Sequence, residues 1–268
     1  MSIQASPGAG RYSQLYYLYS QMVRRDIERR YKSTAGGMLW AIIQPVMMIG
    51  IYTVVFGLIF QPRWPSIASP WDYVLILFLG KIPYLFITES FASAASSMRS
   101  HSNLVKKAGF PRAILPGVSL GSAAYHAMIA LLVWVVFYIC IKGALPYAVL
   151  LLPLVWLPLI MITMGICWFL ATLGAYFRDT DQIVGTFNIA LMFLSPIFYP
   201  MASVPPVLRQ VMQFNPLSYA IESSRALLLW PEKLDLLHYP LHLLIAAVVM
   251  TVGYLFFRRM RSGFADAI

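Results

Sequence analysis

Long apolar runs constrain the fold of this chain more than any other feature of its sequence. A helix needs about 20 mostly apolar residues, at roughly 1.5 Å each, to cross the hydrocarbon core of a bilayer. Charged residues make up only 11% of the chain, against about 25% in soluble domains. We therefore predict one all-α integral membrane domain over residues 1–268. Its six transmembrane helices are expected at residues 38–60, 71–98, 113–141, 147–176, 182–199 and 236–257.

Basic residues determine the expected orientation of these spans. If the N-terminus is cytoplasmic, 14 of the 20 lysines and arginines fall in cytoplasmic segments, five fall outside, and Lys81 lies within a span. Cytoplasmic loops of membrane proteins carry the excess of Lys and Arg. We therefore expect both termini in the cytoplasm. Because topology accounts for the net charge of +10, that charge gives no reason to expect a nucleic-acid partner.

The segment before the first span, residues 12–34, has the pattern of an amphipathic helix. Leu15, Leu18, Tyr19 and Met22 recur at spacings of three and four, and basic residues follow them. Such a helix would lie in the cytoplasmic interface of the membrane. The alternative is a solvated basic flank that only fixes the topology.

The stretch between the fifth and sixth predicted spans is too long for a tight turn and too apolar for a free loop. Pro205 and Pro206 suit the start of a helix, and the sequence NPLSY interrupts the stretch. Within residues 204–230 we expect two short periplasmic re-entrant helices, at about 206–214 and 217–229. Backbone at that depth is tolerated only where protein or water covers it, so we expect a cavity or pathway beside them.

The turn between the second and third predicted spans, residues 102–112, mixes apolar and basic side chains. Its apolar residues are Leu104, Val105 and Phe110, and its basic residues are Lys106, Lys107 and Arg112. The positive-inside rule explains the charges but not the apolar residues among them. A short amphipathic helix that projects at the cytoplasmic face explains both.

Two glycines of the third predicted span, Gly117 and Gly121, are four residues apart. This small-xxx-small spacing lets another helix approach closely. The neighbour could be a helix of the same chain or of a second copy.

Motifs for catalysis are weak throughout the chain. The sequence has no Gly-x-x-x-x-Gly-Lys-Ser/Thr loop, so if this protein pumps by nucleotide hydrolysis, another chain must hydrolyse the nucleotide. Asp179 and Asp181 alone make a weak metal site, and a turn in which one of them caps the fifth span is the better interpretation. His238 and His242 lack the intervening glutamate of a zinc motif. We therefore predict no catalytic residue, no metal site and no cofactor in this chain.

Four stretches together resemble the membrane subunit of ABC-type polysaccharide exporters, a family that exports O-antigen, capsule or teichoic acid. They are RYKSTAGGMLWAIIQPVMMIGIYTVVFGLIF, NLVKKAGFPRAILP, LSPIFYP and NPLSYAIESSRALLL. The resemblance implies a six-span subunit of the bacterial inner membrane that pairs with a second copy around a conduit. It also implies two cytoplasmic ATPase subunits, which bind ATP and Mg²⁺, and an undecaprenyl-diphosphate-linked glycan as substrate.

The resemblance also implies roles for three segments. Residues 102–112 would be the coupling helix that sits on the ATPase, through Leu104, Val105, Lys106, Lys107, Phe110 and Arg112. The N-terminal helix would form the cytoplasmic gate, through Tyr19, Arg24, Arg25 and Arg29. The helices of residues 204–230 would form the periplasmic gate, through Pro205, Pro206, Asn215, Pro216 and Tyr219.

Aromatic residues suit a glycan conduit, because their rings stack on sugar faces without requiring one pattern of hydroxyls. The conduit candidates are Tyr52, Phe56, Lys81, Tyr84, Phe86, Phe193, Phe198 and Tyr199. For each aromatic candidate, the alternative is a lipid-facing or packed side chain.

Lys81 is a charge inside the second predicted span, roughly 14 Å from its outer edge at about 1.5 Å per residue. A charge at that depth costs at least a few kcal/mol. The family usually has an apolar residue here, so the resemblance gives Lys81 no role. Lys81 either faces the conduit, where it meets water, sugar hydroxyls or carrier phosphates, or it is a buried structural charge paired with a carbonyl or with Glu89.

Export of an O-antigen-type polysaccharide is the expected function. Export of capsule or teichoic acid, or of drugs or small lipids, fits the same six-span plan. An integral membrane transferase is the rival from another class, but it would need a carboxylate, histidine or serine constellation at one membrane face.

Overall fold

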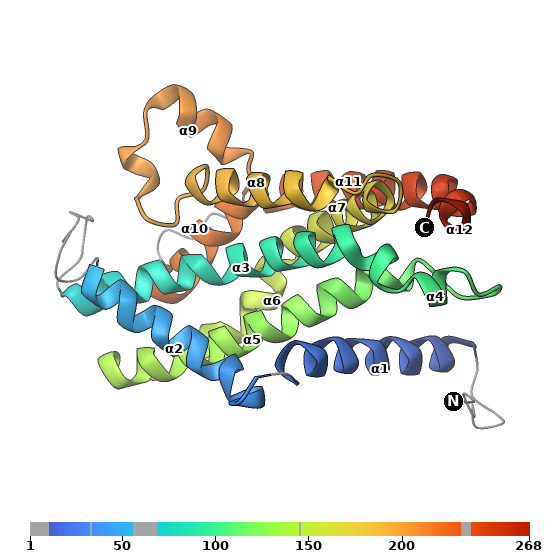
Figure 1. Cartoon of the computed structure of the whole chain (residues 1–268). Helices are drawn as coiled ribbons and strands as arrows, with labels where there is room; N and C mark the ends of the chain where they lie inside the picture. The colour runs from blue at the N-terminus through green and yellow to red at the C-terminus, as the bar shows by residue number, and fades with distance from the viewer. Residues whose placement is uncertain (1–10, 33, 56–68, 145, 232–236) are drawn as a thin grey trace.

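The apolar runs form helices that lie side by side in one bundle (Figure 1). The structure is a computed structural model, and it describes residues 11–32, 34–55, 69–144, 146–231 and 237–268. Within these ranges the regular elements are all helices, as the sequence predicts.

Five helical stretches are long and apolar enough to cross a membrane: Gly37–Val55, Trp71–Ser100, Ile114–Lys142, Leu157–Tyr176 and Tyr239–Gly263. They contain α2 (Trp40–Tyr52), α3 (Pro70–Ser100), α5 (Ile114–Lys142), α7 (Leu157–Tyr176) and α11 (Tyr239–Met260). These helices correspond to the first, second, third, fourth and sixth predicted spans. Residues 56–60 of the first predicted span and residue 236 of the sixth lie outside the described residues.

The fifth predicted span, residues 182–199, extends beyond the helix that the structure has there. Helix α8 covers Thr180–Phe193, 14 residues, or about 21 Å at roughly 1.5 Å per residue. The chain then turns, because Pro196 cannot donate a helical hydrogen bond. In this turn, the carbonyl groups of Pro196 and Ile197 accept hydrogen bonds from the Arg225 side chain.

The fourth predicted span, residues 147–176, is broken into pieces rather than continuous. A 3-10 helix, η3 (Tyr147–Leu151), and the short helix α6 (Leu152–Val155) precede α7. Pro153 and Pro158 each lie within the first two positions of α6 and α7, respectively, where a missing N–H is tolerated. The prolines therefore favour new helix starts over one uninterrupted helix.

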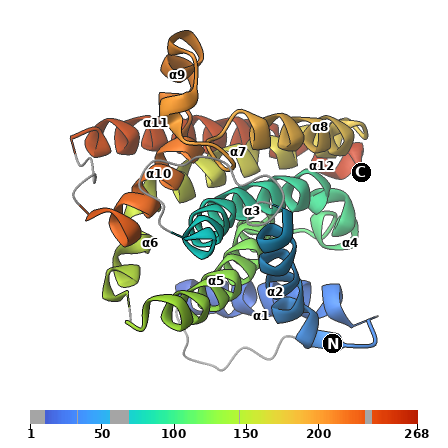
Figure 2. The ribbon, with the colours of Figure 1, turned by 90° about the vertical axis from the view of Figure 1, so that its left-hand side faces the viewer.

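Helix α3 is the centre of the bundle. In Figure 2 it lies between α5 on one side and α7 and α11 on the other, with α2 and α8 beside it. In its most apolar window, 78% of the residues are buried, against 17% in α2 and in α5. The largest cluster of buried apolar residues is built around this helix.

The bundle has two distinct ends. The start of α1 (Arg11–Tyr31) and the C-terminus lie at one end, together with α4 (Ser102–Val105), and we call this the termini end (Figure 1). The start of α3 lies at the opposite end, with the short helices α9 (Pro206–Gln213) and α10 (Pro216–Leu229). We call this the α9–α10 end. The two short helices agree closely with those predicted at 206–214 and 217–229.

Helices α3 and α7 touch backbone to backbone at Gly174. A Cβ atom built on Gly174 would lie 1.8 Å from the carbonyl oxygen of Ala95. Neither backbone can yield without separating the two helices, so only glycine fits at this crossing.

Gly174→Ala is therefore expected to destabilise the protein, by about 1–3 kcal/mol as for other overpacked cores. Thermal unfolding of the detergent-solubilised protein, followed by fluorescence-detected gel filtration, measures the change. Gly185→Ala is the matched control, because a Cβ on Gly185 in α8 meets nothing within 4 Å. Equal melting temperatures for the two variants would contradict the close packing of α3 on α7.

Candidate functional site

Lys81 lies in a cluster of aromatic side chains drawn from separate segments. Its ammonium nitrogen is 4.2 Å from the ring centre of Tyr84 and 5.9 Å from that of Phe198. The same nitrogen is 3.6 Å from the sulfur of Met192 in α8. The Tyr52 ring of α2 meets the Phe198 ring edge-on, with centres 6.4 Å apart. We call these five residues the Lys81 cluster, and they contain four of the predicted conduit candidates.

Two hydrogen bonds from tyrosine hydroxyls to backbone carbonyls hold this cluster in place. The Tyr84 hydroxyl donates to the carbonyl oxygen of Asn188 at 3.1 Å, and the Tyr73 hydroxyl donates to that of Phe198 at 3.0 Å. Cations are attracted to the faces of aromatic rings within about 6 Å. The rings therefore stabilise the Lys81 charge without neutralising it.

The predicted alternative that Lys81 pairs with Glu89 is wrong. The Glu89 carboxylate instead forms an ion pair with Arg30 of α1 and accepts a hydrogen bond from His126 of α5. Glu89 lies about two turns beyond Lys81 on α3, and its partners belong to α1 and α5 rather than to the segments around Lys81. In the described part of the chain, no carboxylate pairs with Lys81.

The other conduit candidates are spread apart. Phe86 is buried within the core, with 3% of its surface exposed, so it does not line an open path in this arrangement. Phe193 is 62% exposed at the end of α8, and its carbonyl oxygen accepts a hydrogen bond from the Tyr199 hydroxyl at 2.5 Å. Phe56 lies outside the described residues.

The N-terminal helix α1 (Arg11–Tyr31) packs along α5. Its predicted apolar face is turned to the bundle, where Met22 is buried against Leu115 and Val118 of α5. Tyr19 and Val23 fill the notch at Gly121, where a Cβ would lie 2.4 Å from the Tyr19 hydroxyl oxygen. A helix of the same chain thus occupies the small-xxx-small surface of α5.

Polar contacts fix α1 at two further points. The Ser122 hydroxyl donates to the Asp26 carboxylate at 2.6 Å, and Arg30 reaches Glu89 and His126 one turn later. Burial, with a smaller effect of Tyr16, raises the pKa of Tyr19, so its hydroxyl stays protonated in the notch. We call Arg30, Glu89 and His126 the α1 latch.

Sequence reasoning missed the α1 latch. Its members come from three helices, and Arg30 and Glu89 are 59 residues apart. The only available signal was a glutamate and a histidine inside apolar runs. Such residues in a span need partners and often face the interior of the bundle.

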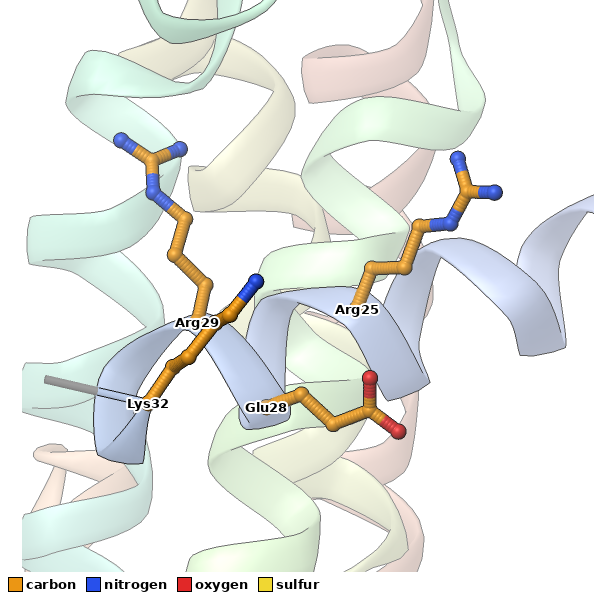
Figure 3. A pocket seen from close by; sticks show the side chains of 4 residues that line it. All are labelled: Arg25, Glu28, Arg29 and Lys32. Atoms are coloured by element: carbon orange, nitrogen blue, oxygen red, sulfur yellow. The ribbon is translucent and has the colours of Figure 1, made fainter. Parts of the chain in front are cut away.

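The basic residues of α1 gather on its solvent side. Arg25, Glu28, Arg29 and Lys32 line an open pocket, and Figure 3 shows the three cationic side chains extending to the same side of the helix. Arg24 pairs with Glu28 one turn away at 2.7 Å. Of the predicted gate residues, Arg25 and Arg29 line this pocket, whereas Tyr19 packs at the Gly121 notch of α5.

The turn predicted as a helix over residues 102–112 is helical only at Ser102–Val105. The rest is irregular because Gly109 adopts a left-handed conformation, with a φ of 81°. Val105 is fully buried, and Leu104 and Phe110 pack on the same apolar cluster. These apolar residues anchor the turn to the bundle.

Arg112 also has a structural position in this turn. Its side chain donates to the carbonyl oxygen of Val105 at 2.9 Å and to that of Arg261 at 2.6 Å. Lys106 and Lys107, in contrast, are exposed at the tip of the turn. Of the six predicted coupling residues, these two lysines are therefore the ones whose side chains remain exposed.

Asn215 caps α10 and joins it to the end of α8. Its side-chain oxygen accepts a hydrogen bond from the Leu217 N–H at 3.0 Å. Its side-chain nitrogen donates to the Leu194 carbonyl and to the Ser195 hydroxyl, each at 3.1 Å. Pro216 takes the first position of α10, as Pro206 does in α9, and Pro205 precedes it.

Arg225 of α10 is buried completely, with 1% of its surface exposed. Its guanidinium donates to the carbonyl groups of Ile76, Pro196 and Ile197 at 2.6–3.2 Å, and it pairs with Glu222 at 2.9 Å. It therefore ties α10 both to α3 and to the turn after α8. The sequence pattern had placed Arg225 only in an outside segment.

The weak metal motifs have other partners. Asp181 pairs with Arg99 of α3, and Asp179 stands at the N-terminus of α8 without a capping side-chain hydrogen bond. His242 of α11 stacks on the Tyr219 ring, with ring centres 4.0 Å apart. Tyr219, a predicted gate residue, therefore packs on α11. Across the described ranges, no group of three His, Cys, Asp or Glu residues could hold a metal ion.

The sequence is similar to a family of known membrane proteins. A family model described as "ABC-2 type transporter" matches residues 17–229, which is more than half of the 268-residue chain. The O-antigen export system permease protein RfbA of Klebsiella pneumoniae is 26% identical over 263 residues, 95% of this chain and 97% of that protein. RfbA of Myxococcus xanthus is 21% identical over 253 residues, 94% of this chain and 95% of that protein. The polysialic acid transport protein KpsM of Escherichia coli is 27% identical over 209 residues, 75% of this chain and 77% of that protein.

Proposed function

This chain belongs to the ABC-2 type transporter family, and from that premise we propose that it is the membrane-spanning subunit of an ATP-driven polysaccharide exporter. The observation that carries the proposal is the similarity to O-antigen export permeases along almost the whole length of both chains. The relatives are permease subunits, so the chain's role is transport rather than catalysis. The substrate proposed is a lipid-linked polysaccharide of the O-antigen type.

Two copies of the chain would form the conduit. Helices α2 and α8 flank α3 and expose large apolar side chains over much of their length, among them Val46, Ile51, Ile183 and Phe187. A second copy that covers part of these faces would enclose the space beside α3. The Lys81 cluster would then lie on the wall of that space, at the junction of α2, α3 and α8.

The two ends of the bundle would carry different gates. The termini end bears the exposed lysines of the α4 turn and the arginines of α11, which favours a cytoplasmic location by the positive-inside rule. In this orientation, α1 lies beside the cytoplasmic entrance, and its basic pocket suits anionic lipid headgroups. Helices α9 and α10 would then close the periplasmic exit in the inner membrane, and the short α8 would complete a count of six spans.

Work would come from two ATPase subunits, which bind ATP and Mg²⁺. ATP binding can only open a path if it favours one conformation of the permease over another. The α4 turn is the proposed contact, because apolar anchors fix it to α3 and α5 while Lys106 and Lys107 remain exposed. Movement of the ATPase at this turn would pass directly to the central helix α3.

Reversing both exposed charges, in a Lys106→Glu, Lys107→Glu variant, should reduce ATPase binding roughly tenfold, since tenfold corresponds to about 1.4 kcal/mol. The measurement is the ratio of ATPase to permease recovered after affinity purification of the permease. An Arg258→Glu, Arg259→Glu variant is the matched control, because these exposed arginines lie at the same end of the bundle on α11. Equal loss in both variants, or in neither, would contradict the proposed contact.

Capsule export is the second candidate. It is favoured by the 27% identity to a polysialic acid transport protein over 75% of this chain. Both candidates share a lipid-linked glycan, a homodimeric conduit and an ATPase partner, and they differ in the glycan that reaches the cell surface.

Reconstitution tests the proposed function directly. The chain and its ATPase partner, in proteoliposomes, are expected to move an undecaprenyl-diphosphate-linked glycan across the bilayer only when ATP is present. A lectin added on one side reports the transfer. Transfer without ATP, or ATP-dependent transfer of a small lipid but not of the glycan, would overturn the proposal.

A further inference from the structure

The central helix α3 keeps an accessible stripe from Lys81 to Ser96. From Tyr73 to Gly80 every residue of α3 is buried. From Lys81 onward, residues at spacings of three and four stay partly accessible: Lys81, Leu85, Thr88, Ala92 and Ser96. This spacing places them on one face of the helix. The stripe combines a cation, two hydroxyl groups, a leucine and an alanine, so three of its five side chains are polar, which is not the composition of a lipid-facing surface.

Lys81 begins this stripe without an anionic partner among the described residues. The two acidic residues of α3 already have partners: Asp72 pairs with Lys142, and Glu89 pairs with Arg30 and His126. A charge inside a membrane helix is costly and usually marks a substrate or ion pathway.

The surroundings of Lys81 leave its hydrogen-bonding capacity open. An ammonium group has three donors, whereas ring faces and a thioether are weak acceptors. The contacts to Tyr84, Phe198 and Met192 therefore hold the charge in position but do not replace an anion. The same rings offer flat apolar surfaces beside the charge, on which a sugar ring can stack.

We propose that Lys81 is a substrate-contacting residue of the conduit, whose ammonium group binds anionic oxygens of the passing substrate. The shared chemistry is a phosphate or carboxylate oxygen next to a sugar ring. It has two possible sources, the diphosphate of the lipid carrier and acidic groups of the glycan repeat. This inference rests on the proposed function, because it places Lys81 on the wall of the conduit.

The experiment compares two substrates in proteoliposomes that contain the permease and its ATPase. Both are undecaprenyl-diphosphate-linked glycans of equal length; one has only neutral hexoses, and the other has one glucuronate in each repeat. Lys81→Met removes the charge at similar volume, and Lys81→Arg keeps it. Leu85→Met is the matched control, because Leu85 is the next residue of the same stripe and has no charge.

Lys81→Met should slow transport of the acidic glycan about tenfold, while Lys81→Arg and Leu85→Met transport it within twofold of the unaltered protein. If only the acidic glycan is slowed, the glycan supplies the anion. If both substrates are slowed equally, the carrier diphosphate supplies it.

Unchanged transport of both substrates by Lys81→Met overturns the inference and leaves the proposed function intact. Equal slowing by Lys81→Met and Lys81→Arg also overturns it, because the charge would not be the property that matters. If the unaltered protein moves neither glycan, the proposed function itself fails.

Discussion

Replacing Arg225 with methionine is expected to cost about 3–5 kcal/mol of stability, because several buried carbonyl groups lose a donor at about 1–3 kcal/mol each. The side chain is fully buried and donates to the carbonyl groups of Ile76, Pro196 and Ile197. Methionine fills part of the volume but leaves these carbonyls without their donor. Because they belong to α3 and to the turn after α8, the whole α9–α10 end should loosen.

Thermal unfolding in detergent measures this loss, and proteolysis shows where it occurs. Glu222→Gln is the control, because it removes the ion pair with Arg225 but keeps the carbonyl contacts, and Glu222 is 42% exposed. We expect Glu222→Gln to melt close to the unaltered protein, and Arg225→Met to melt far below it. An Arg225→Met protein that melts with the control would show that the arginine does not hold this end together.

Glu89→Ala should release α1 from the bundle. The substitution removes the carboxylate that joins Arg30 to His126 and leaves those two side chains beside each other without an anion. Hydrogen bonds to charged groups contribute about 1.5–3 kcal/mol each when buried, and Arg30 is 45% exposed, which reduces its share. We expect a net loss of about 2 kcal/mol, or roughly a thirtyfold increase in the fraction of molecules with α1 detached.

Limited trypsin digestion reports this detachment, because the second half of α1 contains several arginines. Cleavage at these sites should accelerate roughly thirtyfold in Glu89→Ala, while Glu28→Ala, which removes only an exposed pair with Arg24, should be cleaved at the unaltered rate. Polysaccharide export should fall together with α1 docking if α1 acts as the cytoplasmic gate. Slow cleavage of Glu89→Ala would show that the apolar contacts of Tyr19 and Met22 suffice.

Local patterns in the sequence predict the helices well. The apolar runs correspond to five helices long enough to span a membrane, and Pro206 and Pro216 mark the first residues of the two short helices α9 and α10. The apolar spacing in α1 identifies the face that packs on α5. Each of these features depends on residues within a few turns of one another.

The errors and omissions concern contacts between distant segments. The turn after α8 is held by Arg225, 28 or 29 residues later, which donates hydrogen bonds to the carbonyl groups of Pro196 and Ile197. The partners of Glu89 come from α1 and α5, and the rings around Lys81 come from α3 and the turn after α8. A hydropathy pattern shows that such charges need partners, but it does not identify them.

The most direct test of polysaccharide export is the fate of the glycan in a strain that lacks this chain. We predict that the deletion leaves the cell surface without the polysaccharide, while its lipid-linked form accumulates on the cytoplasmic side of the inner membrane. Expression of the unaltered chain should restore the surface polysaccharide. Unchanged surface polysaccharide in the deletion strain, with no internal accumulation, would contradict the account.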